Sequence, residues 1–241
     1  MSIDCSAGST PHPFSNIRTI HGDPALDLLG GPLHRYDLIY ADPPWSFENY
    51  SEKGEDRNAK AWYDCMDIDQ IKALPVKNLA SDNCMLAMWA TFPLLPQAID
   101  VLRAWGFEYV TVGFVWIKLN KSVGLRKVVD LLADVFMSTG YWTRSNAEIV
   151  IFAKRGSPQR QSRSIRQVVH APRGKHSEKP LVFRQHLEDL IVAERRIELF
   201  CRHDADAKWD AWGNQVGAHD AGIIQKRRPE EAPLPLLDLA A

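Results

Sequence analysis

The chain has 241 residues, of which 45% are hydrophobic and 24% are charged, and its formal net charge is −1 at pH 7. These values predict a folded domain with a full core. They exclude a globally basic protein, so any surface for nucleic acid must be local. No apolar run reaches the roughly 18 residues of a membrane span, and the N-terminus lacks the pattern of a signal peptide.

Cysteine usage bears on compartment and on metal binding. The chain has four widely spaced cysteines without a C-x-x-C pair, at Cys5, Cys65, Cys84 and Cys201. This pattern argues against a zinc site and for a reducing, cytoplasmic location. The eight histidines show no ligand spacing either, and we therefore expect no metal.

The two ends of the chain differ in composition from its middle. Residues 1–15 are rich in Ser, Pro and Gly and predict a flexible arm, and residues 217–241 combine charges and prolines and predict a flexible tail. Between them, residues 16–216 alternate apolar runs with amphipathic segments. This alternation predicts an α/β domain with a mostly parallel sheet.

Strands and helices can be assigned in chain order. The expected strands are Asp37–Ala41, Cys84–Ala90, Tyr109–Lys118, Glu148–Ala153, Gln167–His170 and Arg196–Phe200. A first helix is expected after Asp67, with Gln70 completing a capping box, and a second helix is expected to end at Gly106. A third helix is expected to open at Ser177. The apolar stretch Val123–Gly140 is compatible with either a lid or an inserted core helix.

The stretch Asp42-Pro43-Pro44-Trp45, at the end of the first strand, has the residues needed to bind an exocyclic amine. Asp42 offers a carboxylate acceptor, and the two prolines present rigid carbonyls without competing N–H groups. Trp45 offers a flat face on which a purine can stack. The four residues alone support an ordinary turn and an amine-binding site about equally.

Two further clusters carry side chains suited to a ligand. The last expected strand runs into Arg202, at a carboxyl edge where such sheets bind ligands, and Asn214 and Gln215 can read ribose and adenine edges. Lys179, in the first turn of the expected third helix, opposes the helix dipole and so indicates an anionic partner, such as an amino-acid carboxylate. Taken alone, Arg202 and the Gly-Asn turn favour an ordinary surface role, and a solvated Lys179 is an alternative.

A basic stretch follows the fourth expected strand. Between residues 154 and 179 eight Lys and Arg residues face one acid, Glu178. This local excess is compatible with a phosphate-binding surface or with a solvated face. The residues expected to contact nucleic acid are Arg144, Arg160, Arg163, Arg166 and Arg173.

Together the clusters resemble the MT-A70 family of S-adenosylmethionine-dependent adenine-N6 methyltransferases, especially its compact bacterial and phage-type members. The resemblance runs from about Ile17 to Val216 and includes Tyr40–Trp45, Met88–Thr91, Gly113–Lys118, Gly140–Arg144, His176–Pro180, Ile197–Arg202 and Trp212–Gln215. It implies a Rossmann-like methyltransferase sheet with a permuted motif order, in which the Asp-Pro-Pro-Trp strand precedes the cofactor-binding Glu-Leu-Phe strand.

The resemblance also implies roles for individual residues. Asp42, Pro43, Pro44 and Trp45 would hold the target adenine as the catalytic set. The cofactor S-adenosylmethionine would be bound by Asp23, Asp42, Lys179, Arg202, His203, Asn214 and Gln215. The role of Glu148 stays open. The chain departs from the family at 128–136, where an apolar segment replaces a short Gly-rich link.

These roles predict direct, in-line methyl transfer to adenine N6, which needs alignment more than a strong base. Nucleic acid is the expected partner, with DNA favoured over RNA. Three alternatives stay open: an RNA adenine-N6 enzyme, an N4-cytosine enzyme, and a non-catalytic nucleic-acid-binding subunit on the same fold. The sequence does not decide between monomer and homodimer.

Overall fold

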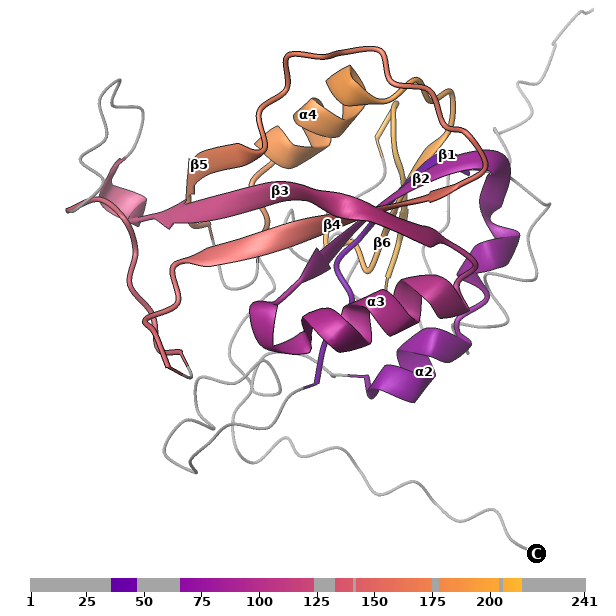
Figure 1. Ribbon diagram of the computed structural model, residues 1–241. Helices are drawn as coiled ribbons and strands as arrows, with labels where there is room; N and C mark the ends of the chain where they lie inside the picture. The colour runs from indigo at the N-terminus through magenta and orange to yellow at the C-terminus, as the bar shows by residue number, and fades with distance from the viewer. Residues whose placement is uncertain are drawn as a thin grey trace, which may run out of the picture.

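The computed structural model describes residues 36–46, 66–123, 133–140, 142–174, 178–203 and 206–213. Within them the strands form one seven-stranded sheet in the order β5-β3-β4-β2-β1-β6-β7 (Figure 1). The strands are β1 (Tyr36–Ala41), β2 (Ala80–Ala90), β3 (Glu108–Leu119), β4 (Ala147–Arg155), β5 (Val168–Pro172), β6 (Arg196–Leu199) and β7 (Asp210–Trp212). The expected N-terminal arm and C-terminal tail lie outside the described residues.

The sheet is mixed, as one strand runs against the others. β4 is antiparallel to both of its neighbours, β2 and β3, and the remaining neighbours pair in parallel. The expected α/β class is confirmed, and the six expected strands are found with ends shifted by one or two residues, except that β2 begins at Ala80, four residues before the expected start. The seventh, β7, was not expected, because three residues are too few to show a period.

Helices cover both faces of the sheet (Figure 1). The helices α2 (Ile68–Ala73) and α3 (Leu95–Ala104) pack on the face that carries Ile39, and α4 (Val182–Leu190) packs on the face that carries Tyr40. Short 3-10 turns are η3 (Val76–Asn78), η4 (Phe92–Leu94) and η5 (Lys121–Val123). Neighbouring residues of one strand therefore serve two separate cores, as expected for a strand buried on both sides.

Local signals set the limits of the first two helices. Asp67 Oδ1 accepts the Gln70 N–H at 2.7 Å, and the Gln70 side chain accepts the Asp67 N–H at 3.0 Å, which confirms the expected capping box. Gly106 ends the turn after α3 with φ of 81°, a left-handed conformation that glycine adopts without a steric penalty.

The start of the third helix was predicted wrongly. α4 begins at Val182 with Leu181 as its N-cap and without a side-chain cap, and Ser177 lies outside the described residues. Lys179 therefore precedes the helix rather than lying in its first turn. The dipole argument for an anionic partner of Lys179 fails, and its environment has to be judged from its contacts.

The segment after β3 was expected to be a lid or a core helix. Its described second half, 133–140, contains no helix, and Val135 forms a bridge with Leu119 at the end of β3. A core helix extending through this half is thus wrong. The first half, 124–132, lies outside the described residues.

Alanine substitutions at two glycines with positive φ, Gly106 and Gly156, distinguish backbone strain from a steric clash. Gly156 has φ of 63°, and an added Cβ would collide with the Asp82 carbonyl, whereas Gly106 has φ of 81° but a Cβ there would only touch Lys77 at 3.7 Å. Gly106→Ala should cost about 1 kcal/mol of unfolding free energy, from the left-handed backbone alone. Gly156→Ala should cost roughly 3 kcal/mol, because a steric clash adds to the strain. Chemical denaturation measures both, and equal losses would contradict the role of the clash.

Candidate active site

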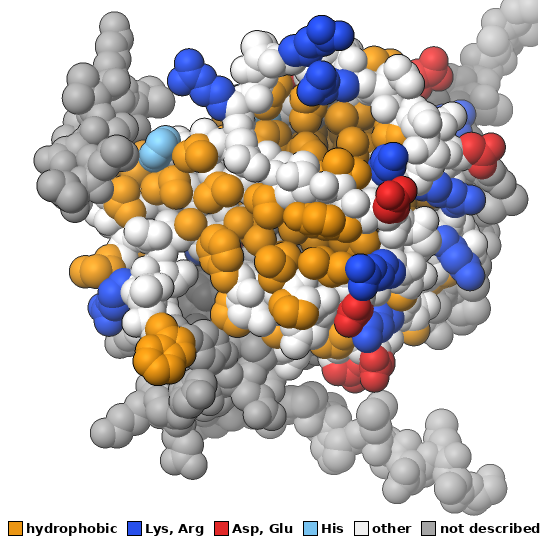
Figure 2. All heavy atoms as spheres, in the orientation of Figure 1, with side chains coloured by type: hydrophobic (Ala, Val, Ile, Leu, Met, Phe, Trp, Pro, Cys, Tyr) orange, Lys and Arg blue, Asp and Glu red, His pale blue; other side chains and the backbone are white. Residues whose placement is uncertain are grey.

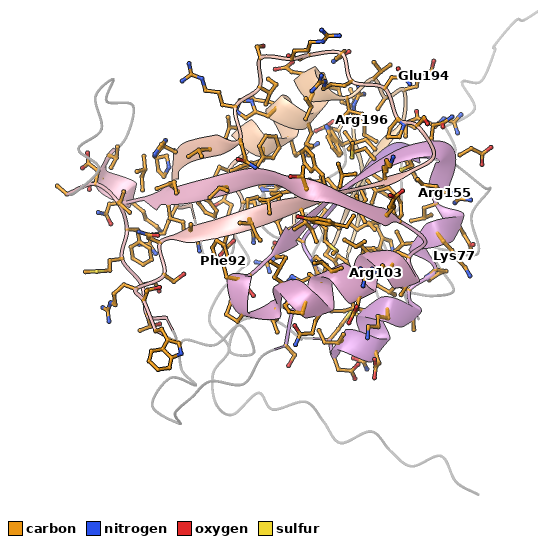
Figure 3. The ribbon with its side chains drawn as sticks, in the orientation of Figure 1. Lys77, Phe92, Arg103, Arg155, Glu194 and Arg196 are labelled. Atoms are coloured by element: carbon orange, nitrogen blue, oxygen red, sulfur yellow. The ribbon has the colours of Figure 1, made fainter. Side chains whose placement is uncertain are left out.

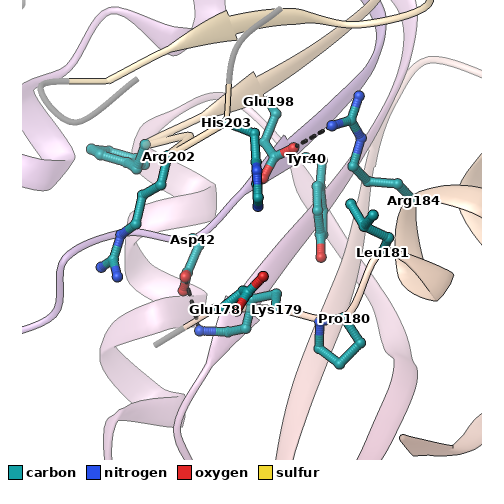
Figure 4. Close-up of a pocket in the computed structure, with 11 residues that line it drawn as sticks. Tyr40, Asp42, Glu178, Lys179, Pro180, Leu181, Arg184, Glu198, Arg202 and His203 are labelled. Atoms are coloured by element: carbon teal, nitrogen blue, oxygen red, sulfur yellow. Dashed lines mark hydrogen bonds and ion pairs between the residues drawn. The ribbon is translucent and has the colours of Figure 1, made fainter. Parts of the chain in front are cut away.

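The chain leaves two neighbouring parallel strands at the same edge of the sheet. Ala41 is opposite Leu199 in the β1–β6 pair, so Asp42 and the residues from Phe200 onward emerge side by side. They meet the segment before α4 in one pocket (Figure 4). The pocket is lined by Tyr40, Asp42, Glu178, Lys179, Pro180, Leu181, Arg184, Glu198, Phe200, Arg202 and His203. Four expected cofactor-binding residues are thus brought together: Asp42, Lys179, Arg202 and His203.

The chain turns at Phe200, which is one of the residues that line this pocket. It has φ of 62°, which is a costly conformation for a residue other than glycine. Its ring packs edge-on against Trp212, with the ring centres 5.4 Å apart. Strain of this kind concentrates at functional sites, where the surrounding packing maintains it.

Four side chains of alternating charge, which we call the charge row, run from the end of β3 to the pocket: Lys118, Glu148, Lys179 and Asp42. Lys179 Nζ donates to Asp42 Oδ2 at 2.8 Å and lies 3.5 Å from Glu148 Oε2. Glu148 also pairs with Lys118 at the end of β3. The four side chains are only 14 to 21% exposed. Lys179 also lies 5.1 Å over the Trp89 ring, so its ammonium is fixed between two carboxylates and an aromatic face.

Within the charge row, the Glu148 carboxylate pairs with two ammonium groups, those of Lys118 and Lys179. Burial raises the pKa of Glu148, but Lys179 and Lys118 lower it by more, so the net pKa lies below the ordinary value. Glu148 therefore stays ionised at neutral pH and holds both ammonium groups. The structure places Glu148, whose role the sequence left open, against Lys179, which in turn lies beside Asp42.

A second group of charged side chains contains Arg184 and Glu198, which also line the pocket. Arg184 pairs with Glu198 at 3.5 Å and with Asp206 at 2.6 Å (Figure 4 shows the first pair). Burial raises the pKa of Glu198, and the neighbouring Arg184 and His203 offset this only in part. The Oε2 atom of Glu198 is buried and accepts no hydrogen bond within the part of the chain that the structure describes.

The Asp-Pro-Pro-Trp turn differs from the expectation in two respects. The Pro43 carbonyl already accepts the Trp45 N–H at 2.8 Å, and the Pro44 carbonyl accepts the Met66 N–H at 3.0 Å. Within the described residues each carbonyl accepts one backbone hydrogen bond, and a carbonyl oxygen can accept two. Trp45 is 5% exposed and donates its indole N–H to the Trp89 carbonyl at 3.1 Å. Its ring is part of the core and does not offer an open stacking face, because the indole hydrogen bond and the core packing hold it inward.

The five arginines expected to contact nucleic acid fall into two groups. Figure 3 marks the two ends of the sheet, with Arg155 and Arg196 toward one end and Phe92 toward the other. Arg144 precedes β4 and Arg173 follows β5, so both lie at the end where Asp42 emerges.

The other three arginines, Arg160, Arg163 and Arg166, lie in the loop 156–167. Figure 2 shows Lys and Arg side chains gathered on this side of the molecule. The loop is attached to the C-terminal turn of α4 through the Gln161 N–H, which donates to Leu190, and Arg160 forms a bridge with Ile191. The end of α4 lies at the amino edge of the sheet, so Arg160 is remote from Asp42. Arg173 itself stacks 3.3 Å over the Phe136 ring.

Three of the expected cofactor-binding residues, Asp23, Asn214 and Gln215, lie outside the described residues. The sequence analysis did not predict the ion pairs of Lys118 with Glu148 and of Glu198 with Arg184. The available signal was a charged residue within an otherwise apolar strand, which in a buried strand requires a partner. Within the described residues, no cluster of His, Cys, Asp and Glu is arranged for a metal, and no helix is long and apolar enough to cross a membrane.

Comparison with known proteins identifies the family of this chain. A profile of the MT-A70 family matches residues 36–215. The type II methyltransferase M.MunI of a Mycoplasma species is 31% identical over 77% of this chain and 79% of its own length. An N(6)-adenosine-methyltransferase MT-A70-like protein of Arabidopsis thaliana is 27% identical over 79% of this chain but only 24% of its own length. The N(6)-adenine-specific methyltransferase METTL4 of Homo sapiens is 27% identical over 75% of this chain and 37% of its own length. Because the profile covers most of the chain and a relative above 30% identity aligns over most of both sequences, this chain belongs to the MT-A70 family.

Proposed function

We propose that this protein is an S-adenosylmethionine-dependent methyltransferase that acts on adenine N6 in nucleic acid. The observation that carries the proposal is the Asp-Pro-Pro-Trp turn at the carboxyl end of β1, whose carboxylate is held by Lys179 at 2.8 Å beside a pocket. Family membership and the names of the relatives, which specify adenine N6, support the same reaction.

The pocket side chains suit the cofactor. Lys179 provides a cation for the carboxylate of its amino-acid part, and Arg202 provides donors for the ribose. The Glu198 carboxylate, whose Oε2 pairs with Arg184 Nη1 at 3.5 Å but accepts no hydrogen bond within the described residues, provides an acceptor for a hydroxyl or ammonium group. When bound, S-adenosylmethionine would supply an electrophilic methyl group on a sulfonium. Asp23, His203, Asn214 and Gln215 complete the proposed cofactor-binding set. The Asp-Pro-Pro-Trp strand before the Glu-Leu-Phe strand is the permuted order that we propose for the family motifs.

The residues of this chain would act by positioning. Asp42 accepts an N–H of the adenine amine, and the Pro43 and Pro44 carbonyls can accept the other. Hydrogen bonds of this kind keep electron density on the nitrogen and align it for displacement. Because Lys179 also has Glu148 at 3.5 Å, its ammonium keeps a counter-ion when Asp42 turns to the amine.

Product analysis tests the proposed reaction. The protein is incubated with S-adenosylmethionine and with DNA or RNA, and the polymer is digested to nucleosides. We expect N6-methyladenine, and N4-methylcytosine would overturn the choice of base. The absence of S-adenosylmethionine binding in a calorimetric titration would instead favour the non-catalytic subunit.

DNA is the proposed polymer. The type II methyltransferase is matched over 79% of its own length, whereas the N6-methyladenosine RNA methyltransferase MTA1 of Cryphonectria parasitica is matched over 52% and the plant relative over 24%. The free, buried cysteines Cys84 and Cys201 suit the proposed reducing cytoplasm. The same product analysis on both polymers distinguishes DNA from RNA.

Two charge reversals test which group of arginines contacts the polymer. Arg144 is exposed at the site end of the sheet, and Arg160 is exposed at the other end. We expect Arg144→Glu to weaken binding by about tenfold at low salt and to reduce the salt dependence of binding, because one phosphate contact is lost. Arg160→Glu serves as the matched control with the same charge change. Fluorescence anisotropy over a salt series measures the affinity of each variant and its salt dependence. A larger effect at Arg160 would indicate that the polymer binds at the loop 156–167 instead.

A further inference from the structure

An exposed tryptophan lies on the loop that joins β3 to β4. Trp142 is 100% exposed, whereas the other tryptophans within the described ranges are at most 5% exposed. Tryptophan is usually largely buried, because exposure of its large apolar surface is unfavourable. Such a side chain indicates a partner, and the surroundings of the loop indicate which one.

Backbone hydrogen bonds attach the loop to Lys118, the first residue of the charge row of the active site. On one side the Phe136 N–H donates to the Lys118 carbonyl at 2.7 Å, and on the other the Lys118 N–H donates to the Asn146 carbonyl at 2.9 Å. The side chain of Lys118 pairs with Glu148, which holds Lys179 beside Asp42. Both arms of the loop therefore start from a residue that is linked to the proposed adenine site.

The tip of the loop is closed and its geometry limits the reach of Trp142. The Ser138 N–H donates to the Ser145 carbonyl at 2.9 Å, which makes 138–145 a hairpin-like tip. Figure 1 shows the loop extending beyond the ends of β3 and β4. Trp142 is four residues from Asn146, so its backbone lies at most about 14 Å from that anchor. This distance corresponds to a few base-pair steps along a nucleic-acid duplex.

The charges around Trp142 favour nucleic acid as the partner. Arg144, two residues away, is exposed, and Arg173 lies on Phe136 at the foot of the loop. The acid of the described loop, Asp134, is 7% exposed and faces inward. An open aromatic ring beside cations is the combination that stacks on bases while the cations meet phosphates.

We propose that Trp142 stacks on a base beside the target adenine and fills the space that this adenine leaves when it turns out of a duplex. The proposal rests on the proposed function, since a base inside a duplex cannot reach Asp42 without being turned out. Apolar and aromatic side chains serve as such wedges in other nucleic-acid complexes. Trp45, which was expected to stack on the target adenine, is 5% exposed and cannot serve as such a wedge.

Activity on paired and unpaired adenine tests the wedge. We expect Trp142→Ala to lower kcat/KM on a duplex with an unmethylated target adenine by about 10- to 100-fold, as expected for the loss of one stacked base. The loss should be much smaller when the same adenine is supplied in a single strand, because no base has to be displaced. Trp142→Phe should retain most of the duplex activity. Tyr109→Ala, at a 38% exposed aromatic at the start of β3, is the control and should have no effect. Equal losses on duplex and single strand, or no loss on duplex, would overturn the proposal.

A fluorescence titration tests stacking without activity. Because Trp142 is the exposed tryptophan of the described part, the difference between the wild-type and Trp142→Phe emission reports on it. A short duplex should quench this difference signal. If the wild type methylates no polymer, the proposed function has failed, but the quenching still supports base contact at Trp142. Identical quenching in the two proteins would overturn the contact itself.

Discussion

Asp42→Ala is expected to lower the rate of methyl transfer by about 10²- to 10³-fold, because the amine loses its carboxylate acceptor and its alignment. The fold should survive, since Lys179 keeps Glu148 as a counter-ion at 3.5 Å. The measurement is transfer of a labelled methyl group under single-turnover conditions, together with the melting temperature.

Two variants make this experiment specific. Asp42→Asn keeps one acceptor oxygen and should lose less activity than Asp42→Ala. Asp100→Ala removes a carboxylate on α3 that is 56% exposed and lies 3.6 Å from Arg103, and it should leave the activity unchanged. Wild-type activity in Asp42→Ala would show that the proposed mechanism is wrong.

Glu148→Gln is expected to lower the free energy of unfolding by about 2 kcal/mol at pH 7, because two mostly buried ammonium groups lose their shared carboxylate. The folded protein holds the Glu148 pKa below its ordinary value of 4.5. Ionised Glu148 therefore stabilises the fold above that pH, and the stabilisation is lost as the pH falls through the lowered pKa. The difference between wild type and variant should accordingly narrow below about pH 4.5.

A double variant distinguishes electrostatics from packing. In Glu148→Gln, Lys179 keeps Asp42 at 2.8 Å, whereas Lys118 loses the carboxylate that it pairs with, so adding Lys118→Met removes that charge and should recover part of the lost stability. Denaturant unfolding at several pH values measures the whole cycle. A destabilisation by Glu148→Gln that is the same at low and neutral pH would show that charge is not its cause.

The position of Lys179 also connects stability with activity. If Glu148 holds Lys179 for the cofactor carboxylate, Glu148→Gln should weaken S-adenosylmethionine binding in addition to stability. A merely structural role for Glu148 would leave the cofactor affinity unchanged once the protein is folded. Calorimetric titration at a temperature where both proteins are folded gives this comparison.

Local sequence patterns predicted the elements that depend on near neighbours. The capping box at Asp67 and Gln70 and the left-handed turn at Gly106 involve residues a few positions apart, and the structure confirms both. The third helix was misplaced because Ser177 and Pro180 carry the expected signals, but the helix starts at Val182. A start signal shows that a helix is permitted, whereas packing of Phe183 and Leu187 in the core sets where it forms.

The sequence by itself determined the α/β class, the family, and the Asp-Pro-Pro-Trp turn at the end of a buried strand, because hydrophobic periodicity and motif order are properties of the chain. Only the tertiary structure decided which side chains share a site. The order of the strands brings Asp42 to Lys179 across 137 positions, puts Trp45 in the core, and separates Arg144 from Arg160. Such contacts depend on how distant segments pair and pack, and a local pattern contains no information on that distance in space.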